Sequence, residues 1–435
     1  MAKDEKRTVT PRLRFPEFRE MKGWMVRALA LLLSRPPEYG INAASVPFSE
    51  TLPTYLRITD IDDEGCFISE SKVSVDADID EDNYVSDGDL VLARTGASVG
   101  KSYRYRECDG RLVFAGFLIR IRPNPKKLMP TLLASYLATR QYWDWVRMTS
   151  ARSGQPGING KEYSVLPIPL PISDLDEYGL SEQRKIADCL TSLDELIAAQ
   201  GRKVDGLKTH KKGLMQQLFP REGETLPRRR FPEFRNTPEW EPYPFEEFVA
   251  TSFYGTSRST SANGRYPVLR MGNMVGGGIE FSNLAYIDLD RKEFELIRLQ
   301  NGDILLNRTN SLDLVGKISI FTLESECITA SYIVTFRLNK ARLIPAFCNA
   351  MLNTQLYKAK IKLLAMPSVS QANINPTTFR KELRISVPAI AEQQRIANCV
   401  SALDAGIAAE AEKLATLKTH KQGLMQQLFP WPGGD

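Results

Sequence analysis

The chain has 435 residues, which is enough for two or three domains that each bury an ordinary core. Its 57 basic and 52 acidic residues leave a net charge of +5, which excludes a uniformly basic surface and favours local patches for any contact with a polyanion. The start of the chain is charged, and the longest apolar run, residues 28–33, is too short to cross a bilayer. We therefore expect a cytoplasmic protein without membrane contact.

The first half of the chain has the pattern of a mixed α+β domain. Short β-like runs such as Asp89–Ala93 and Val113–Ile121 are followed by a helical stretch from Pro130 to about Met148. Charge is unevenly distributed, because residues 60–89 hold twelve acidic residues and one lysine, whereas residues 101–127 hold eight basic residues. If this half meets phosphate, we expect it to use the second stretch.

Each half is predicted to end in a long amphipathic helix. Apolar side chains recur at the three- and four-residue steps of a coiled-coil seam, and two matched stripes in one chain favour an intramolecular antiparallel pair. A helix from Ser181 to Phe219 would be roughly 58 Å long at 1.5 Å per residue, long enough to act as a spacer. The predicted seam positions are Ile186, Leu190, Leu193, Ile197, Val204, Leu207, Leu214, Leu218, Ile396, Val400, Leu403, Ile407, Leu414, Leu417, Leu424 and Leu428.

Polar residues interrupt both stripes at matching places. Gln200 and Lys211 interrupt the first stripe, and Glu410 and Lys421 interrupt the second. Because a buried lysine needs a partner, one attractive register of the antiparallel pair places Lys211 opposite Glu410 and Gln200 opposite Lys421.

The two halves of the chain are copies of one plan. Pro11–Phe18 (PRLRFPEF) returns as Pro227–Phe234 (PRRRFPEF), and the sequence KTHK at residues 208 and 418 leads both times into GLMQQLFP. Inside the halves, DGDLVLARTG parallels NGDILLNRTN. Between them, residues 219–245 contain six prolines and three consecutive arginines, which predicts an extended connector that cannot be helical.

These features predict an α+β fold with two tandem mixed domains, each followed by a long helix, and a pseudo-twofold internal repeat. The predicted parts are a first globular domain at residues 1–177, a helix at 178–220, a proline-rich connector at 221–244, a second globular domain at 245–389 and a helix at 390–430.

No motif for catalysis, metal binding or nucleotide binding is found in the sequence. There are only two histidines, no GxxxxGK[ST] loop, no GxGxxG after a predicted strand, and no closely spaced pair of cysteines. We expect this chain to have no catalytic residue and to bind no metal or cofactor. A methyltransferase or nuclease that acts alone would require a motif that the sequence lacks.

Basic and amide side chains near the ends of predicted strands suit contacts with double-stranded DNA. Arginine can donate two hydrogen bonds to a guanine edge, amides can pair in the same way with adenine, and lysine and hydroxyl groups suit phosphate. The alternatives stay open, since the same residues also occur as charged or polar turns. The candidates are Arg57, Arg94, Thr95, Lys101, Gln155, Asn159, Arg270, Asn273, Arg308, Thr309, Lys317, Gln371, Asn373 and Asn375.

Over nearly its whole length the chain resembles the specificity subunits of type I restriction-modification systems. The likeness rests on SEQRKIADCLTSLDELIAAQ and AEQQRIANCVSALDAGIAAE at the helix starts and on LKTHKxGLMQQLFP at both helix ends. The GD and RT elements and the two Q-x-x-I-N segments inside the halves add to it.

The resemblance implies a DNA-binding subunit without catalysis. Each globular half would be a target recognition domain that reads one part of a bipartite, asymmetric target, and the helices would set the gap. Two modification subunits would bring S-adenosylmethionine and adenine methylation, and restriction subunits would add ATP and Mg for cleavage in defence against foreign DNA. The alternative left open by the residues is a coiled-coil scaffold that binds only proteins.

Overall fold

The structure, a computed structural model, describes residues 8–152, 154–172, 176–367 and 371–431. Contacts divide the chain into two compact units. Unit 1 comprises Met1–Gly201 and Glu412–Asp435, and unit 2 comprises Arg202–Ala411. Unit 2 is thus one continuous segment, whereas unit 1 is assembled from two segments that lie far apart in the sequence.

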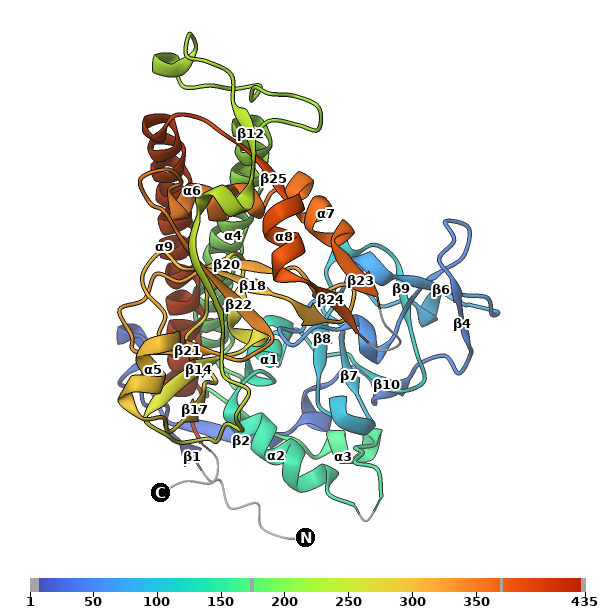
Figure 1. The fold of residues 1–435 in the computed structure, drawn as a ribbon. Helices are drawn as coiled ribbons and strands as arrows, with labels where there is room; N and C mark the ends of the chain where they lie inside the picture. The colour runs from blue at the N-terminus through green and yellow to red at the C-terminus, as the bar shows by residue number, and fades with distance from the viewer. Residues whose placement is uncertain (1–7, 153, 173–175, 368–370, 432–435) are drawn as a thin grey trace. The chain divides into compact units, whose positions relative to one another are not determined.

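The globular part of unit 1 is a mixed α+β domain, and its elements can be followed in Figure 1. Its strands are β1 (Thr8–Val9), β2 (Trp24–Ala28), β3 (Glu38–Tyr39), β4 (Ser45–Pro47), β5 (Thr54–Leu56), β6 (Val73–Val75), β7 (Leu90–Ala93), β8 (Ser102–Arg104), β9 (Leu112–Phe114), β10 (Leu118–Ile121) and β11 (Pro167–Leu170). Its short helices are α1 (Pro130–Tyr136), α2 (Arg140–Ser150) and α3 (Gly160–Ser164). The main sheet has the order β3-β10-β7-β8, a second has the order β4-β6-β5-β9, and a third has the order β1-β2-β11.

Two elements predicted as continuous are divided in unit 1. The predicted strand Val113–Ile121 is two strands, because β9 pairs with β5 in the second sheet and β10 pairs with β7 in the main sheet. The chain changes sheets at residues 115–117. The predicted helix from Pro130 to Met148 is likewise two helices, and the Thr139 hydroxyl caps the second by accepting the Tyr142 N–H.

Unit 2 repeats this plan with different insertions. Its strands are β12 (Glu241–Pro244), β13 (Val249–Tyr254), β14 (Tyr266–Leu269), β15 (Met274–Val275), β16 (Gly278–Ile279), β17 (Ala285–Ile287), β18 (Ile304–Asn307), β19 (Thr309–Asn310), β20 (Ile318–Ile320), β21 (Ile328–Thr329), β22 (Ile333–Leu338), β23 (Ala365–Pro367), β24 (Ala372–Ile374) and β25 (Arg384–Val387). Its short helices are α5 (Arg291–Ile297), α6 (Pro345–Leu352), α7 (Gln355–Leu363) and α8 (Pro376–Glu382). The sheet β13-β22-β18-β20 corresponds to β3-β10-β7-β8, and the parallel pair β14·β21 corresponds to β5·β9.

The predicted connector belongs to unit 2 and is only partly irregular. A 3-10 turn at Pro232–Phe234 and strand β12 fall inside it, and Trp240 is buried in the main core of the unit. The same turn occurs at Pro16–Phe18 in unit 1, so the repeated FPEF sequence makes the same local structure twice.

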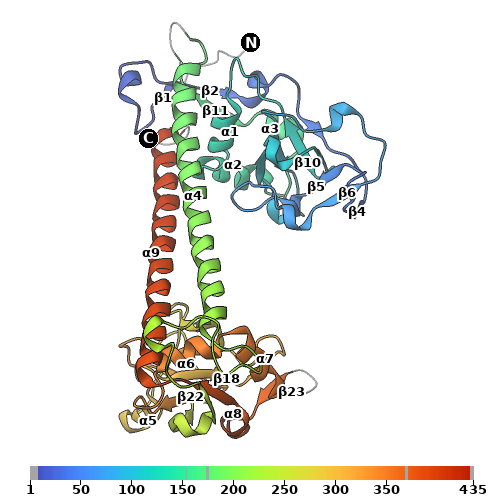
Figure 2. The ribbon, with the colours of Figure 1, turned by 90° about the horizontal axis from the view of Figure 1, so that it is seen from above.

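The two long helices are α4 (Leu180–Leu218) and α9 (Ile390–Leu428). In unit 1 the start of α4 packs beside the end of α9, and in unit 2 the end of α4 packs beside the start of α9 (Figure 2). The predicted antiparallel pair is confirmed. All sixteen predicted seam residues are buried or half-buried. None of the helices in the described ranges combines the length and the apolar character that a membrane span requires.

The predicted register of this pair is wrong by about one heptad. The ion pairs between the helices are Lys203 with Glu410, Lys211 with Asp404, and Lys421 with Asp194. The residue numbers in these pairs add to 613 or 615, where the prediction required 621. A shift of one heptad keeps the apolar contacts, so the stripe alone does not fix the register. The half-buried Lys211 reaches out of the seam to the surface carboxylate of Asp404, while Glu410 pairs with Lys203.

Carbodiimide coupling of the unmodified protein tests this register. The reagent joins a lysine amine to a carboxylate only where the two groups touch. We expect peptide mass spectrometry to find Lys211 joined to Asp404, and Lys421 joined to Asp194. A Lys211–Glu410 product without the Lys211–Asp404 product would support the register that the sequence favours.

The repeated N-terminal segments fasten the start of each long helix. In unit 1 the Arg14 guanidinium donates two hydrogen bonds of 2.7 Å to the Glu182 carboxylate, and the Trp24 indole N–H donates to the same carboxylate. In unit 2 Arg230 donates two hydrogen bonds of 2.7 Å to Glu392. These buried ion pairs explain why the segment PRxRFPEF and the helix starts SEQ and AEQ recur together.

Candidate nucleic-acid interface

In each unit the fold brings together two loops that the sequence predicts as DNA contacts. In unit 1 the Ile158 N–H donates to the Arg94 carbonyl at 2.9 Å. In unit 2 the Ile374 N–H donates to the Arg308 carbonyl at 2.8 Å, and β19 pairs with β24. We call residues 94–96 with 155–159, and residues 308–310 with 371–375, the two loop pairs.

The loop pairs present amide and hydroxyl groups at the surface. Gln155, Gln371 and Asn373 are exposed, while Thr95 and Thr309 are half-buried. The Thr309 hydroxyl donates to the Asn373 side-chain oxygen at 3.2 Å, which orients that amide. Amides held in this way suit hydrogen bonds to an adenine edge, as expected from the sequence.

The last asparagine of each Q-x-x-I-N segment has a structural role. The Asn159 oxygen accepts the Glu162 N–H at 3.0 Å and caps α3. The Asn375 oxygen accepts the Thr377 N–H at 2.8 Å and caps α8. Since Ser, Thr, Asp and Asn are preferred at helix N-caps, this repeated asparagine has a local explanation that does not involve DNA.

Three other candidates are engaged inside their own units. Arg57 forms a bidentate ion pair with the buried Asp60, whose hydrogen bond raises the pKa of the guanidinium. The Arg270 N–H donates to the oxygen of Asn273, and the Asn273 amide donates to the carbonyls of two further residues, 280 and 282. Asn273 is buried with both ends of its amide bonded, so it shapes the loop and does not reach solvent.

The basic stretch at residues 101–127 is largely neutralised within unit 1. Five of its eight cations lie in ion pairs with carboxylates: Lys101, Arg106, Arg111, Arg120 and Arg122. Lys101 contacts Asp63 at 2.6 Å, and this contact holds the pKa of the Asp63 carboxyl below its usual value. Most of this stretch is therefore not a free phosphate-binding patch. The acidic stretch at residues 60–89 supplies the partners of Lys101, Arg111 and Arg122. Arg106 pairs instead with Asp109, and Arg120 pairs most closely with Glu38.

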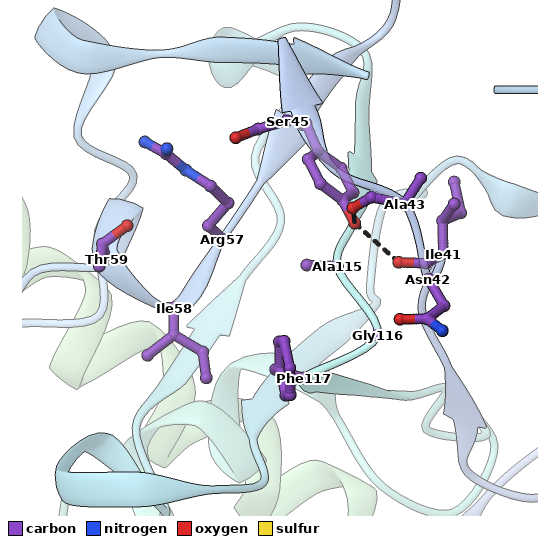
Figure 3. Close-up of a pocket in the computed structure, with 11 residues that line it drawn as sticks. Ile41, Asn42, Ala43, Ser45, Arg57, Ile58, Thr59, Ala115, Gly116 and Phe117 are labelled. Carbon is purple, nitrogen blue, oxygen red and sulfur yellow. Dashed lines mark hydrogen bonds between the residues drawn. The ribbon is translucent and has the colours of Figure 1, made fainter. Parts of the chain in front are cut away.

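A pocket of about 380 Å³ lies in unit 1 (Figure 3). It is linked to the first loop pair by Phe117, which lines the pocket and whose carbonyl accepts the Arg94 N–H at 3.1 Å. The turn between β9 and β10 forms part of its wall, and the Phe117 ring at its edge is 60% exposed. Tyr55 also lines the pocket; its hydroxyl donates to the Ile41 carbonyl at 2.7 Å, and burial raises its pKa. An exposed aromatic edge beside an apolar pocket can contact a thymine methyl group.

Two tyrosines that were not predicted from the sequence lie beside candidate arginines. In unit 1 the Arg94 Cζ lies 5.0 Å from the centre of the Tyr39 ring, and in unit 2 the Arg308 Cζ lies 5.2 Å from the centre of the Tyr254 ring. We call these the arginine–tyrosine pairs. Each tyrosine is followed by glycine at an offset of 215 residues, close to the 214-residue offset between the arginines, and this repeated dipeptide was the available signal.

The side chains that the loop pairs expose are suited to binding. Among the described residues, no group of three or more His, Cys, Asp or Glu side chains is placed to hold a metal ion. The loop pairs offer guanidinium, amide and hydroxyl groups, which are the groups that proteins use for DNA bases and phosphates.

A model of the type I restriction modification DNA specificity domain matches the chain twice, at residues 53–208 and 239–419. The StySPI specificity subunit of Salmonella potsdam is 23% identical over 75% of this chain and 69% of its own length. The MjaVIII specificity subunit of Methanocaldococcus jannaschii is 22% identical over 79% of each protein. A shorter match to the MjaX specificity subunit of the same organism is 30% identical but covers 38% of this chain and 39% of that protein.

The fold agrees with a solved structure of the same class. The crystal structure of the S subunit of a type I restriction-modification system from M. genitalium superposes with a TM-score of 0.57 over 97% of this chain and 99% of that chain, at 13% identity. The predicted fold class, with two tandem domains and two long helices that pack together, is confirmed by this likeness.

Proposed function

Because the chain belongs to the family of type I restriction-modification DNA specificity domains, we propose that it reads a DNA target for a modification and restriction complex and has no catalytic role of its own. Two domains of one plan with different insertions would read the two parts of a bipartite, asymmetric target. The observation that most directly supports contact of both units with DNA is the loop pair, because the same main-chain bonds hold the same kinds of polar side chain at the surface of each unit.

The chemistry would come from partner subunits. Two modification subunits would bind S-adenosylmethionine and methylate adenine at N6, one at each part of the target. Restriction subunits would supply ATP- and Mg-dependent translocation and cleavage. Two partners fit the internal repeat, since each of the two matching surfaces of the chain would seat one copy. Action on cellular DNA would place this complex in the cytoplasm.

Mapping of N6-methyladenine tests the proposal. The chain is co-expressed with a cognate modification subunit in a host without methylation of its own, and the host genome is sequenced for modified adenine. We expect a two-part motif with a fixed gap. If both proteins are present and co-purify but no new methylation occurs, a scaffold that binds only proteins becomes the better account.

The two predicted phosphate contacts should differ in strength. Lys317 is exposed and has no carboxylate partner in the described part of the chain, whereas Lys101 is already paired with Asp63. We expect Lys317→Ala to weaken binding to a labelled duplex more than Lys101→Ala, and to lower the slope of log affinity against log salt by about 0.9. Equal effects of the two substitutions would contradict the ion pair as the reason. The methylated motif should stay unchanged in both variants, since phosphate contacts carry no sequence information.

A further inference from the structure

The arginine–tyrosine pairs occupy equivalent places in the main sheets of the two units. In each, the tyrosine ends the edge strand, and the arginine follows the strand two places away in the sheet. The Cα partners are Tyr39 with Ile119 and Leu118 with Ala93 in unit 1, and Tyr254 with Val334 and Ile333 with Asn307 in unit 2. The strand register around the two pairs is therefore the same, and the arginine–tyrosine pair is one structural motif that occurs in both units.

The glycine after each tyrosine is part of this motif. A Cβ atom on Gly40 would lie 2.2 Å from the Phe114 carbonyl oxygen, and a Cβ atom on Gly255 would lie 1.9 Å from the Thr329 carbonyl oxygen. No other residue type fits at these distances. The glycines let the edge strand turn close against the neighbouring strand, so that each tyrosine ring remains about half exposed, at 50% and 48%.

The two guanidinium groups keep their charge available. Neither Arg94 nor Arg308 forms an ion pair with a carboxylate of the described residues, in contrast to Arg57 and Arg120. Among the described residues, Arg94 Nη1 donates a long hydrogen bond of 3.4 Å to the Gly116 carbonyl. The Arg308 Nε–H is buried and has no hydrogen-bond partner within the described ranges. A stacked arginine without a counter-charge is prepared for an anion that is not part of this chain.

The internal repeat indicates which feature of DNA this anion is. The two units are proposed to read different base sequences. Residues present in both units are then expected to contact features present in both half-targets, and residues present in one unit are expected to contact the bases that differ. The arginine–tyrosine pairs are shared. The neighbouring segments differ, since in unit 1 β4 lies between β3 and β5 and extends the second sheet, whereas the matching sheet of unit 2, β17-β14-β21, lacks such a strand among the described residues. After β17 unit 2 has helix α5, where unit 1 has only a 3-10 turn at Glu81–Asn83 after β6. The backbone phosphates are common to every target.

We propose that the arginine–tyrosine pairs are phosphate clamps, one in each unit, in which Tyr39 and Tyr254 are positioning residues that hold the guanidinium groups against the DNA backbone. Base reading then belongs to the segments that differ between the units, among them β4, whose Ser45 lines the pocket of unit 1. This inference rests on the proposed function and assigns its phosphate-contacting residues.

Matched substitutions at both sites test the clamps in the complex with modification subunits, on a labelled duplex that carries the motif found by methylation mapping. Arg94→Gln and Arg308→Gln are each expected to weaken binding about 10-fold at low salt and to lower the salt slope by about 0.9. Arg→Lys at the same positions should weaken binding less than Arg→Gln, because lysine still offers the phosphate a point charge although it loses the planar stack on the tyrosine.

The tyrosines are tested by leucine and phenylalanine variants. Tyr254→Leu should weaken binding about 2- to 5-fold through loss of the cation–π contact, and Tyr254→Phe should bind like the wild type because it keeps the ring. Tyr39→Phe additionally loses the bond that its hydroxyl accepts from the Gly160 N–H, so Tyr254 is the cleaner site. Circular dichroism shows whether each variant is folded. If a leucine variant is unfolded, the arginine variants alone test the proposal.

The methylated motif decides between a clamp and a base contact. A clamp leaves the motif unchanged in every variant that still methylates. Relaxed preference at one base pair, in the half-target of the substituted unit, would overturn the proposal and make the arginine a base reader. Unchanged affinity and salt slope in the arginine variants would also overturn it. A wild-type complex that shows no motif and no affinity for duplex DNA would instead remove the proposed function itself.

Discussion

Replacing Glu182 with alanine is expected to lower the free energy of unfolding of unit 1 by about 3–5 kcal/mol, because it leaves a buried guanidinium without its counter-charge. The side chains of Arg14 and Glu182 are only 6% and 2% exposed. The substitution removes both hydrogen bonds from Arg14 and also the acceptor of the Trp24 indole N–H. Arg14 would keep only its contacts with two backbone carbonyls.

A urea titration followed by tryptophan fluorescence measures this loss. Four of the five tryptophans, Trp24, Trp143, Trp145 and Trp431, lie in unit 1, so the signal reports mainly on that unit. The control is Glu17→Ala, which removes a surface contact with Lys185 and should leave the midpoint close to that of the wild type. A double variant with Met at position 14 and Leu at position 182 should recover much of the stability. A loss as small as that of the control would show that the pair is solvated.

Replacing Phe429 with alanine is the second substitution with a large expected effect. The Phe429 ring packs edge-on against Trp24, with ring centres 6.3 Å apart, and against Tyr136 at 5.8 Å. Truncation leaves a cavity in the main core of unit 1 and should cost about 3–5 kcal/mol. The contact of the Gln141 amide with the Phe429 carbonyl is made by the backbone and would remain.

Trp431→Ala is the matched control for this substitution. Trp431 lies two residues further along and is 42% exposed, so its loss should change stability by no more than about 0.5 kcal/mol. Phe219→Ala is the equivalent in unit 2, where the ring contacts Trp240 and Phe347. If Phe429→Ala unfolds at the same urea concentration as Trp431→Ala, the end of α9 does not contribute to the core as described.

Much of the architecture could be predicted because the sequence contains an internal repeat. The repeats of FPEF and GLMQQLFP mark equivalent points in both units, and the apolar stripes predict that α4 and α9 pair. The register could not be predicted, because an apolar seam tolerates a shift of one heptad. The partners of Lys211 and Lys421 are surface aspartates outside the stripe, which no spacing rule singles out.

The candidate site was predicted in part. Arg94 and Gln155 are 61 residues apart in the sequence, and only the fold shows that their loops form one surface. Residue type alone does not distinguish Arg94, which has no ion pair with a described carboxylate, from Arg57, which forms an ion pair with Asp60. Tyr39 was missed because its only signal, a Tyr-Gly dipeptide repeated at Tyr254, is short, and its meaning depends on strand pairing between distant segments.

The core of unit 1 contains Met425, Leu428 and Phe429, and this has a consequence for how the protein is made. Unit 2 is continuous and has all its residues once the chain has been synthesised to residue 411, whereas unit 1 begins first and must wait for the end of α9. At about 5–20 residues per second, the ribosome needs roughly 10–40 s to pass from the end of α4 to Phe429. During that interval the apolar surface around Trp24 and Tyr136 has no permanent cover, so the first unit to emerge is the last to be completed.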